Sequence, residues 1–340
     1  MPDKLTQKIQ KLFLEAGYDL SGDPVLDKAS AKAPVNWALV KYWGKRDIDL
    51  NIPAVSSLSV AAPLFTRTEI QLADTDSFTL NGEQISNRNT DFKRLYAYLD
   101  LLLGEKRPHL KIDSENDVST ASGFASSASG FAACVLALNA LYGWGMDDTH
   151  LSILARLWSC SACRSIYPGF AVWHKGERED GMDSFSSSMP VSWPEIRIGM
   201  LETSSARKPL GSTQAMLHSA ATSPLYKKWL KTNSDALEII KKAIFEKNLE
   251  VFVNAVQANA LFMHEVIRTS APLPNGKKLD YFLPETREAL ETLKGLQNDG
   301  VVIGATMDAG PQVKLVFHEK DTDLVSSSFP TVKVMAPYFG

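Results

Sequence analysis

The sequence predicts a protein of the α+β class with two domains. Its 340 residues are too many for the usual single compact domain. Strand-like and helical stretches follow one another without the regular alternation of a doubly wound sheet. A serine-rich passage of low hydrophobicity, "GMDSFSSSMPVSWP", separates the two halves. We therefore expect one domain over 1–190 and a second domain over 191–340.

Composition narrows the class of protein. With 44% hydrophobic and 22% charged residues, the chain is typical of a globular protein, and its formal net charge of −3 argues against a nucleic-acid partner. Three cysteines are too few for a disulfide framework, which favours a reducing cytoplasm. The longest apolar stretch, 130–144, is too short to span a bilayer and predicts a buried helix.

Hydrophobic periodicity gives the elements of the first domain. The first twenty residues lack an apolar signal core and predict a short surface helix. Alternation over 35–40 is typical of a half-buried strand, and Asn81-Gly82 predicts a hairpin turn. A helix is expected to begin at Asn89 or Thr90. Further strands are expected over 66–74, 109–117 and 169–174, and helices up to Tyr142 and over 147–158.

The second domain shows similar signals. Residues 195–203 alternate as a strand does, and long helical patterns run from Asp235 to Ile267. A helix is expected from about Pro284 to Asn298. The stretch 300–319 predicts a strand, a tight turn and a second strand. No internal repeat or heptad run is visible.

One short stretch concentrates positive charge. "KYWGKRD", Lys41–Asp47, holds three cations and two large aromatic residues directly after the strand-like alternation. Charge runs usually lie on solvated faces. The stretch is therefore either an exposed turn or a surface that faces an anion.

A loop of small residues, Ser119–Gly130, precedes the apolar helix. Small residues let backbone N–H groups approach a ligand, and the positive end of the helix dipole points back at such a loop. Phosphate is the natural occupant, and the hydroxyls of Ser126 and Ser127 could reach a phosphate oxygen or a metal. No Walker signature is present. A tightly packed helix start with serine caps explains the loop equally well.

Three segments together resemble one family. They are "APVNWALVKYWGKRD", "STASGFASSASG" with "SCSACRS", and "TMDAGPQV". This pattern is similar to that of diphosphomevalonate decarboxylases, within the GHMP kinase superfamily. "PAVSSLSV" and "GSTQAM" fit as well, and the likeness runs from about Ala31 to the C-terminus. The resemblance implies an α+β N-terminal domain, a ferredoxin-like C-terminal domain and an active site in the cleft between them.

The resemblance also implies a reaction in the mevalonate route to isoprenoids. ATP and (R)-5-diphosphomevalonate would give isopentenyl diphosphate, ADP, phosphate and carbon dioxide, with Mg²⁺ as cofactor. Asp308 would take the proton of the C3 hydroxyl, Lys41 would keep that carboxylate ionised, and Arg164, oriented by Asn36, would hold the substrate carboxylate. The substrate diphosphate would lie on Tyr42, Lys45, Ser159, Ser161, Lys208 and Ser212, and ATP and Mg²⁺ on Ser122, Gly123, Ala125, Ser126 and Ser127, with Ser127 on the metal.

Departures and rival interpretations remain. Cys160 stands where glycine is usual, Ser119 replaces a common proline, Phe124 replaces leucine and Gln312 replaces asparagine; we expect Cys160 to affect diphosphate affinity more than turnover. Cys160 and Cys163 have redox or half-zinc spacing, but no second pair accompanies them. The rivals are a monophosphate decarboxylase, a kinase of the mevalonate 3-hydroxyl and a non-catalytic metabolite sensor. The resemblance further implies a cytoplasmic homodimer.

Overall fold

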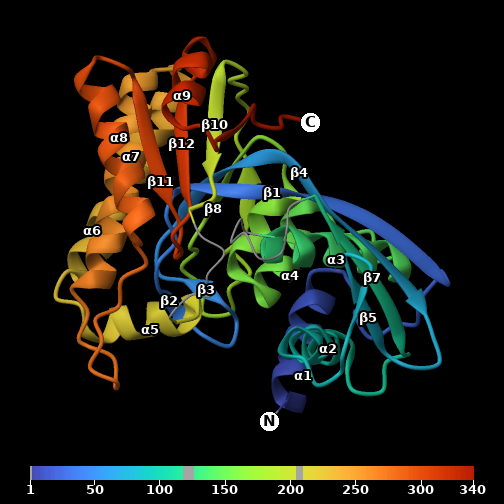
Figure 1. The fold of residues 1–340 in the computed structure, drawn as a ribbon. Coiled ribbons are helices and arrows are strands. Elements are labelled where there is room, and N and C mark those ends of the chain that lie inside the picture. Colours follow the sequence, from blue (N-terminus) through green and yellow to red (C-terminus); the bar gives the residue numbers. More distant parts are fainter. Residues whose placement is uncertain (1, 118–125, 204–209) are drawn as a thin grey trace.

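The computed structural model describes residues 2–117, 126–203 and 210–340, and it has a two-domain α+β architecture (Figure 1). The first half contains a seven-stranded sheet, and the second half contains a four-stranded sheet with helices packed beside it. The first half consists of α1 (Pro2–Glu15), β1 (Lys28–Val40), β2 (Lys45–Asp47), β3 (Ile52–Pro53), β4 (Ser57–Leu72), β5 (Ser77–Leu80), β6 (Glu83–Ile85), α2 (Thr90–Leu103), β7 (Leu110–Asn116), α3 (Ser126–Tyr142), α4 (Asp148–Trp158), the 3₁₀ helix η2 (Cys160–Ile166), β8 (Phe170–Trp173) and β9 (Ser186–Ser188).

The second half begins with β10 in a new sheet. Its elements are β10 (Ile196–Leu201), α5 (Ser212–Thr222), α6 (Tyr226–Phe245), α7 (Leu249–Arg268), α8 (Pro284–Asn298), β11 (Ile303–Met307), β12 (Val313–His318), η3 (Glu319–Asp321), α9 (Thr322–Ser328) and β13 (Lys333–Met335). The sheet order is β11-β12-β10-β13, with all neighbours antiparallel. The first sheet has the order β6-β5-β7-β4-β8-β9, and β1 pairs with β4.

Local sequence signals explain several of these elements. Asn81 and Gly82 have φ angles of 51° and 79°, as a two-residue hairpin turn of type I′ requires. Asn89 caps α2 by accepting a hydrogen bond from the backbone N–H of Asp91 at 2.7 Å. Both predictions are confirmed.

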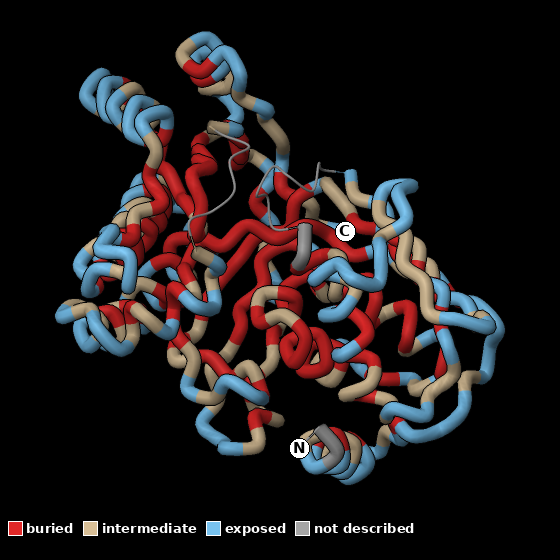
Figure 2. The backbone as a smooth tube through the Cα atoms, turned by 60° about the horizontal axis from the view of Figure 1, so that its bottom comes forward, coloured by how far each residue is buried: buried red, intermediate tan, exposed pale blue. Residues whose placement is uncertain are grey.

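The prediction that residues 35–40 form a half-buried strand is wrong in one respect, the burial of β1. Its eight residues from Ala33 to Val40 are all buried, not half-buried. The helix α3 packs against β1, and Val35, Trp37 and Leu39 share a hydrophobic core with residues of α6 and α7. The two halves are therefore joined through a common core across β1, which appears as a continuous buried region through the middle of the molecule (Figure 2).

The long helical patterns expected from Asp235 to Ile267 correspond to two helices, α6 and α7. The helix α6 ends at Phe245, Lys247 adopts a φ of 50°, and α7 begins at Leu249. The side chain of Asn248 accepts a hydrogen bond from the N–H of Val251 at 3.1 Å and caps α7. This break lets both helices pack side by side and against the end of β1.

The C-terminal residues return to the first half of the chain. The N–H of Tyr338 donates to the carbonyl oxygen of Ala61 on β4, and the N–H of Gly169 donates to the carbonyl oxygen of Tyr338, at 2.8 and 2.7 Å. The chain therefore crosses between the halves twice.

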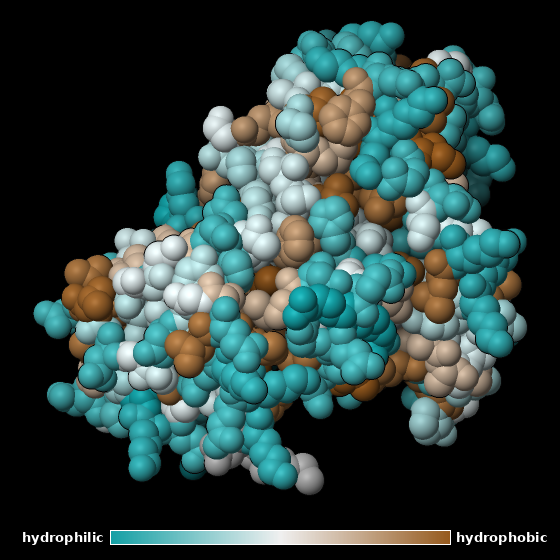
Figure 3. Space-filling view, turned by 180° about the vertical axis from the view of Figure 1, so that it is seen from behind, coloured by the Kyte–Doolittle hydropathy of each residue, from teal (hydrophilic) through white to brown (hydrophobic). Residues whose placement is uncertain are grey.

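The surface is polar over most of the face seen from behind. Hydrophilic side chains cover much of that face, and hydrophobic ones gather in separate patches (Figure 3). Among the helices that the structure describes, none combines the length and apolar character needed to cross a membrane.

Candidate active site

The main cavity lies between the two halves and has a volume of about 550 Å³. Residues from the end of β1, from η2, from α5 and from the turn after β11 line it. All nine predicted site residues with described side chains line this cavity, namely Asn36, Lys41, Tyr42, Lys45, Ser159, Ser161, Arg164, Ser212 and Asp308. Ser122, Gly123, Ala125 and Lys208 lie outside the described residues, as do the side chains of Ser126 and Ser127 at the start of α3.

Lys41 is fixed where β1 leaves the sheet. The pairing of β1 with β4 has irregularities between Pro34 and Asn36 and between Ala38 and Val40, and such bulges turn side chains away from the sheet. The backbone N–H of Lys41 donates to Asn259 Oδ1 on α7 at 2.7 Å. The end of the strand is thereby held by the other half of the protein.

Two lysines bracket the carboxylate of Asp308. Lys41 Nζ lies 2.8 Å from Oδ1, and Lys314 Nζ on β12 lies 2.5 Å from Oδ2. Lys41 Nζ also donates to the carbonyl oxygen of Ala38 at 2.9 Å. Both lysine side chains are buried, while a third of the Asp308 side chain is exposed. The carboxylate therefore borders the cavity with a cation on each oxygen.

This arrangement controls ionisation. Burial by itself would raise the pKa of Asp308, but the charges of Lys314 and Lys41 outweigh it and hold the pKa well below its ordinary value. Burial lowers the pKa of Lys41 to about 8, and Asp308 opposes that shift. At neutral pH the Asp308 carboxylate is therefore ionised, with a lysine at each of its oxygens.

Arg164 lies on η2 and lines the same cavity. Its Nη1 donates to Ser57 Oγ at 2.7 Å and its Nε to Asn36 Oδ1 at 3.3 Å. Asn36 Nδ2 in turn donates to Ser165 Oγ at 2.7 Å. The guanidinium also lies over the ring of Trp173, 5.9 Å from its centroid. These contacts fix a buried cation at the cavity wall, where its planar fork suits a carboxylate.

Tyr42 and Lys45 line another part of the wall. The Tyr42 hydroxyl donates to Cys160 Sγ at 3.1 Å. Lys45 Nζ donates to Asn51 Oδ1 at 2.5 Å. Cys160 is the residue that departs from the family pattern. Its thiol therefore accepts the hydrogen bond of the Tyr42 hydroxyl, which was expected to bind the substrate diphosphate.

The remaining residues of "KYWGKRD" shape the turn. Gly44 has a φ of 119°, and a Cβ there would overlap the hydroxyl of Tyr226. The carbonyl oxygen of Trp43 accepts from Trp229 Nε1 at 2.9 Å, which ties the turn to α6. Glycine is therefore required for this close approach between the two halves.

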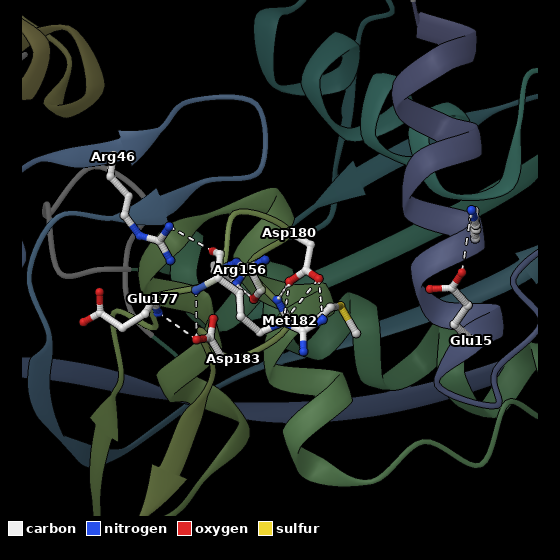
Figure 4. A network of polar contacts seen from close by, with 10 residues as sticks. Glu15, Arg46, Arg156, Glu177, Asp180, Met182 and Asp183 are labelled. Atoms are coloured by element: carbon white, nitrogen blue, oxygen red, sulfur yellow. Dashed lines mark hydrogen bonds and ion pairs between the residues drawn. The ribbon is translucent and has the colours of Figure 1, made fainter.

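Arg46 and Asp47 each contact the backbone of a loop. Arg46 donates to the carbonyl oxygens of Arg178 and Lys175, and Asp47 Oδ1 accepts from the N–H of Leu50. Figure 4 shows Arg46 pointing at the loop that also carries Asp180 and Asp183. Of the three cations in the motif, Lys41 and Lys45 border the cavity and Arg46 holds a loop outside it.

The loop before β9 is fixed from within as well. The buried Arg156 of α4 donates through Nη1 to the carbonyl oxygens of Gly181 and Ser184, both at 2.5 Å (Figure 4). Asp183 accepts from the N–H groups of Glu177 and Arg178. This network is structural, because neither arginine lines the cavity.

A second cavity of about 400 Å³ lies between α2, α3 and the strands β5 and β7. Phe78, Leu80, Ile112 and Phe131 give it apolar walls. Arg94 lines both cavities, and its guanidinium carbon lies 4.8 Å from the ring centroid of Phe131. Arg94 was not predicted as a site residue, because the sequence does not distinguish an arginine that borders a cavity from other arginines on the polar face of a helix.

Within the described ranges, no group of three or more His, Cys, Asp or Glu side chains could hold a metal ion. Mg²⁺ prefers oxygen ligands, including phosphates and water, and rarely needs a cage made by the protein alone.

Two family models match the chain and together cover most of it. The diphosphomevalonate decarboxylase-like N-terminal domain matches residues 33–186, and the mevalonate 5-diphosphate decarboxylase C-terminal domain matches residues 200–336. The chain belongs to the diphosphomevalonate decarboxylase family. Curated relatives that are similar to the chain also belong to this family. The diphosphomevalonate decarboxylase of Gibberella zeae is 37% identical over an alignment that covers 90% of this chain and 85% of the relative. That of Saccharomyces cerevisiae is 34% identical and covers 85% of this chain and 77% of the relative.

Solved structures of diphosphomevalonate decarboxylases share the fold. A complex of the protein named MDDEF with MVAPP, AMPPCP and magnesium has a TM-score of 0.84 and 31% identity, covering 92% of this chain and 97% of that chain. The mevalonate diphosphate decarboxylase of Staphylococcus aureus has a TM-score of 0.83 and 29% identity, covering 92% and 96%. The expected two-domain α+β fold is therefore confirmed.

Proposed function

We propose that the protein catalyses the ATP-dependent decarboxylation of (R)-5-diphosphomevalonate to isopentenyl diphosphate, with release of ADP, phosphate and carbon dioxide. One observation carries the proposal. Asp308, from the second half, lies 2.8 Å from Lys41 of the first half, in a cavity that Arg164 also lines. A carboxylate, an ammonium and a guanidinium thus converge on one space large enough for a small anionic substrate.

The chemistry requires such a set of charges. Hydroxide is a poor leaving group, so the C3 oxygen of the substrate must be phosphorylated before it can depart. When phosphate leaves, positive charge develops at C3, and the electrons of the breaking bond to the carboxylate form the double bond. Phosphoryl transfer of this kind depends on positioning and on charge stabilisation.

We assign the roles as follows. Asp308 accepts the hydrogen bond of the C3 hydroxyl and stabilises the cationic centre that follows. Lys41 neutralises charge on the transferring phosphoryl group. Arg164, held by Asn36 and Ser57, binds the substrate carboxylate in a bidentate manner.

The diphosphate end of the substrate binds at the other part of the main cavity. Lys45 supplies positive charge there, and Arg94 adds a second cation at the border between the two cavities. Hydroxyls of Tyr42, Ser159, Ser161 and Ser212 complete this wall. Lys208, proposed from the resemblance, belongs to the same set.

ATP binds beside α3. The apolar second cavity suits the adenine base, and the backbone at the N-terminus of α3 suits phosphate, with Ser122, Gly123, Ala125, Ser126 and Ser127 as proposed contacts. Mg²⁺ would neutralise phosphate charge, with Ser127 as its proposed protein ligand. The complex of MDDEF with MVAPP, AMPPCP and magnesium supports the use of ATP and Mg²⁺, but the residues named here are our proposal.

The setting of the enzyme is also a proposal. The three cysteines are buried and free, which fits a reducing compartment such as the cytoplasm. A homodimer stays a prediction, and sedimentation of the purified protein would test it.

Substrate profiling tests the function. Purified protein is given ATP, Mg²⁺ and, in turn, mevalonate, its phosphate or its diphosphate, while ADP and carbon dioxide are measured together. We expect equal amounts of both products with the diphosphate alone. ADP without carbon dioxide would indicate a kinase, preference for the monophosphate would indicate the related decarboxylase, and nucleotide binding without turnover would indicate a sensor.

A further inference from the structure

Lys314 is a buried cation that the proposed reaction has not yet used. It lies on β12, six residues after Asp308, and is 1% exposed. Its ammonium contacts Oδ2 of Asp308, whereas Lys41 contacts Oδ1. A lone lysine in the apolar run "VKLVFH" would be costly to bury without a partner, and the carboxylate is a partner of opposite charge.

The two lysines are anchored differently. Lys41 follows β1 in the first half, whereas Lys314 lies on the same hairpin as Asp308, paired in register with Thr306 on β11 and Met200 on β10. The contact from Lys314 therefore stays in place within one rigid hairpin. The contact from Lys41 spans the two halves and ends at the cavity.

We propose that Lys314 is the positioning residue for Asp308: it keeps the carboxylate ionised and aimed into the cavity through Oδ2, so that Oδ1 can accept the C3 hydroxyl when Lys41 turns to the transferring phosphoryl group. This inference rests on the proposed function. ATP and the substrate diphosphate bring several negative charges close to Asp308, and these favour its protonation. A protonated Asp308 could no longer accept the hydroxyl proton, and Lys314 opposes that loss.

Other charged groups near Asp308 do not replace Lys314. Arg164 of η2 is electrostatically coupled to Asp308 and keeps its charge throughout the useful pH range. His264 of α7 is also coupled to it, but burial lowers the pKa of His264 to about 3, so this imidazole is neutral during turnover. In a Lys314 variant, Asp308 would rely on Lys41 and Arg164, both of which are needed by the substrate.

The test compares Lys314→Met, Lys314→Gln and Lys314→Arg with the wild-type enzyme. The readouts are kcat and KM with ATP and diphosphomevalonate from pH 5 to pH 8, together with the melting temperature. We expect the uncharged variants to lose about tenfold to a hundredfold in kcat. Their activity relative to wild type should fall further towards pH 5, because Asp308 without Lys314 takes up a proton at higher pH. Lys314→Arg should restore the wild-type pH dependence.

The sheet offers a matched control. Lys333 on β13 pairs with Met200 on the opposite edge of β10, in register with Lys314, but its side chain is exposed. Lys333→Met should leave kcat and the pH profile unchanged.

The outcomes are separable. A folded Lys314→Gln or Lys314→Met enzyme whose activity ratio to wild type is the same at every pH would overturn the positioning role, as would a change confined to KM. If Lys314→Met does not fold, the Gln variant, which retains a hydrogen-bond donor without the charge, decides the matter. Failure of the proposed function would instead appear as absence of carbon dioxide release by the wild-type enzyme.

Discussion

Asn259 accepts a hydrogen bond from the backbone N–H of Lys41 at 2.7 Å, across 218 residues of sequence. Its amide group also donates to Asn233 Oδ1 at 2.8 Å, and Asn233 donates to the carbonyl oxygen of Ser56 at 2.9 Å. Two buried amides from α6 and α7 therefore hold the backbone beside the catalytic cavity.

Replacing Asn259 with alanine should loosen this connection. The backbone N–H of Lys41 and the side-chain oxygen Oδ1 of Asn233 would each lose a buried hydrogen-bond partner, at a cost of ~1–3 kcal/mol in the free energy of unfolding. We expect a lower melting temperature and a lower kcat, because Lys41 would lose its fixed position. The exposed Asn254 on the same helix is the control, since Asn254→Ala should change neither.

Asp308→Ala should lower turnover by orders of magnitude while diphosphomevalonate still binds. In the proposed reaction the carboxylate acts mainly in the transition state, so kcat and kcat/KM should fall together. Single-turnover measurement of ADP release and a separate binding titration check this. A near-normal rate in this variant would show that Asp308 is not the essential carboxylate.

Lys45→Ala should raise the KM for diphosphomevalonate more than it lowers kcat, because Lys45 lines the main cavity but contacts Asn51 and not Asp308. Arg46→Ala is a control from the same motif. Arg46 binds carbonyl oxygens of a loop and does not line the cavity, so its removal should leave KM unchanged. Equal KM values in wild type and Lys45→Ala would argue against a diphosphate contact.

Cys160→Gly should lower the KM for diphosphomevalonate or leave it unchanged. Removing the thiol frees the Tyr42 hydroxyl, which now donates to Sγ, while the added glycine destabilises the fold by ~0.5–1 kcal/mol. Steady-state kinetics and thermal unfolding measure the two effects. Complete loss of activity in a folded Cys160→Gly protein would mean that the thiol has a positive role.

The pH dependence should show an alkaline limb near pH 8. Burial lowers the pKa of Lys41 to about 8, so the fraction of charged Lys41 falls as the pH rises through that value. Since the proposed reaction uses the charged form to neutralise phosphoryl oxygens, kcat/KM should decline above about pH 8. A kcat/KM that stays constant up to pH 9.5 would contradict this assignment.

The sequence predicted what depends on local signals. The turn at Asn81-Gly82 and the cap at Asn89 need only neighbouring residues, and both were found. The motif residues Lys41, Arg164 and Asp308 were recognised from the family resemblance, and the structure brings them to one cavity.

What the sequence did not predict depends on tertiary contacts. Lys314 and Asn259 gain their importance from partners in space: Lys314 looks like one charge in an apolar strand, and Asn259 like one polar residue in an amphipathic helix. The burial of both faces of β1 was missed for the same reason, because alternation in sequence does not reveal that α3 covers one side and α6 and α7 the other. The sequence likewise did not show where the helical patterns over 235–267 divide, at the three-residue break between α6 and α7.

The return of Tyr338 to β4 has a consequence for heat denaturation. Because the last residues add backbone hydrogen bonds to Ala61 and Gly169, and because β1 shares a core with α6 and α7, neither half can melt while the other keeps its native contacts. Calorimetry should therefore record one cooperative endotherm rather than two, and removal of the final three residues should shift that endotherm to lower temperature as a whole.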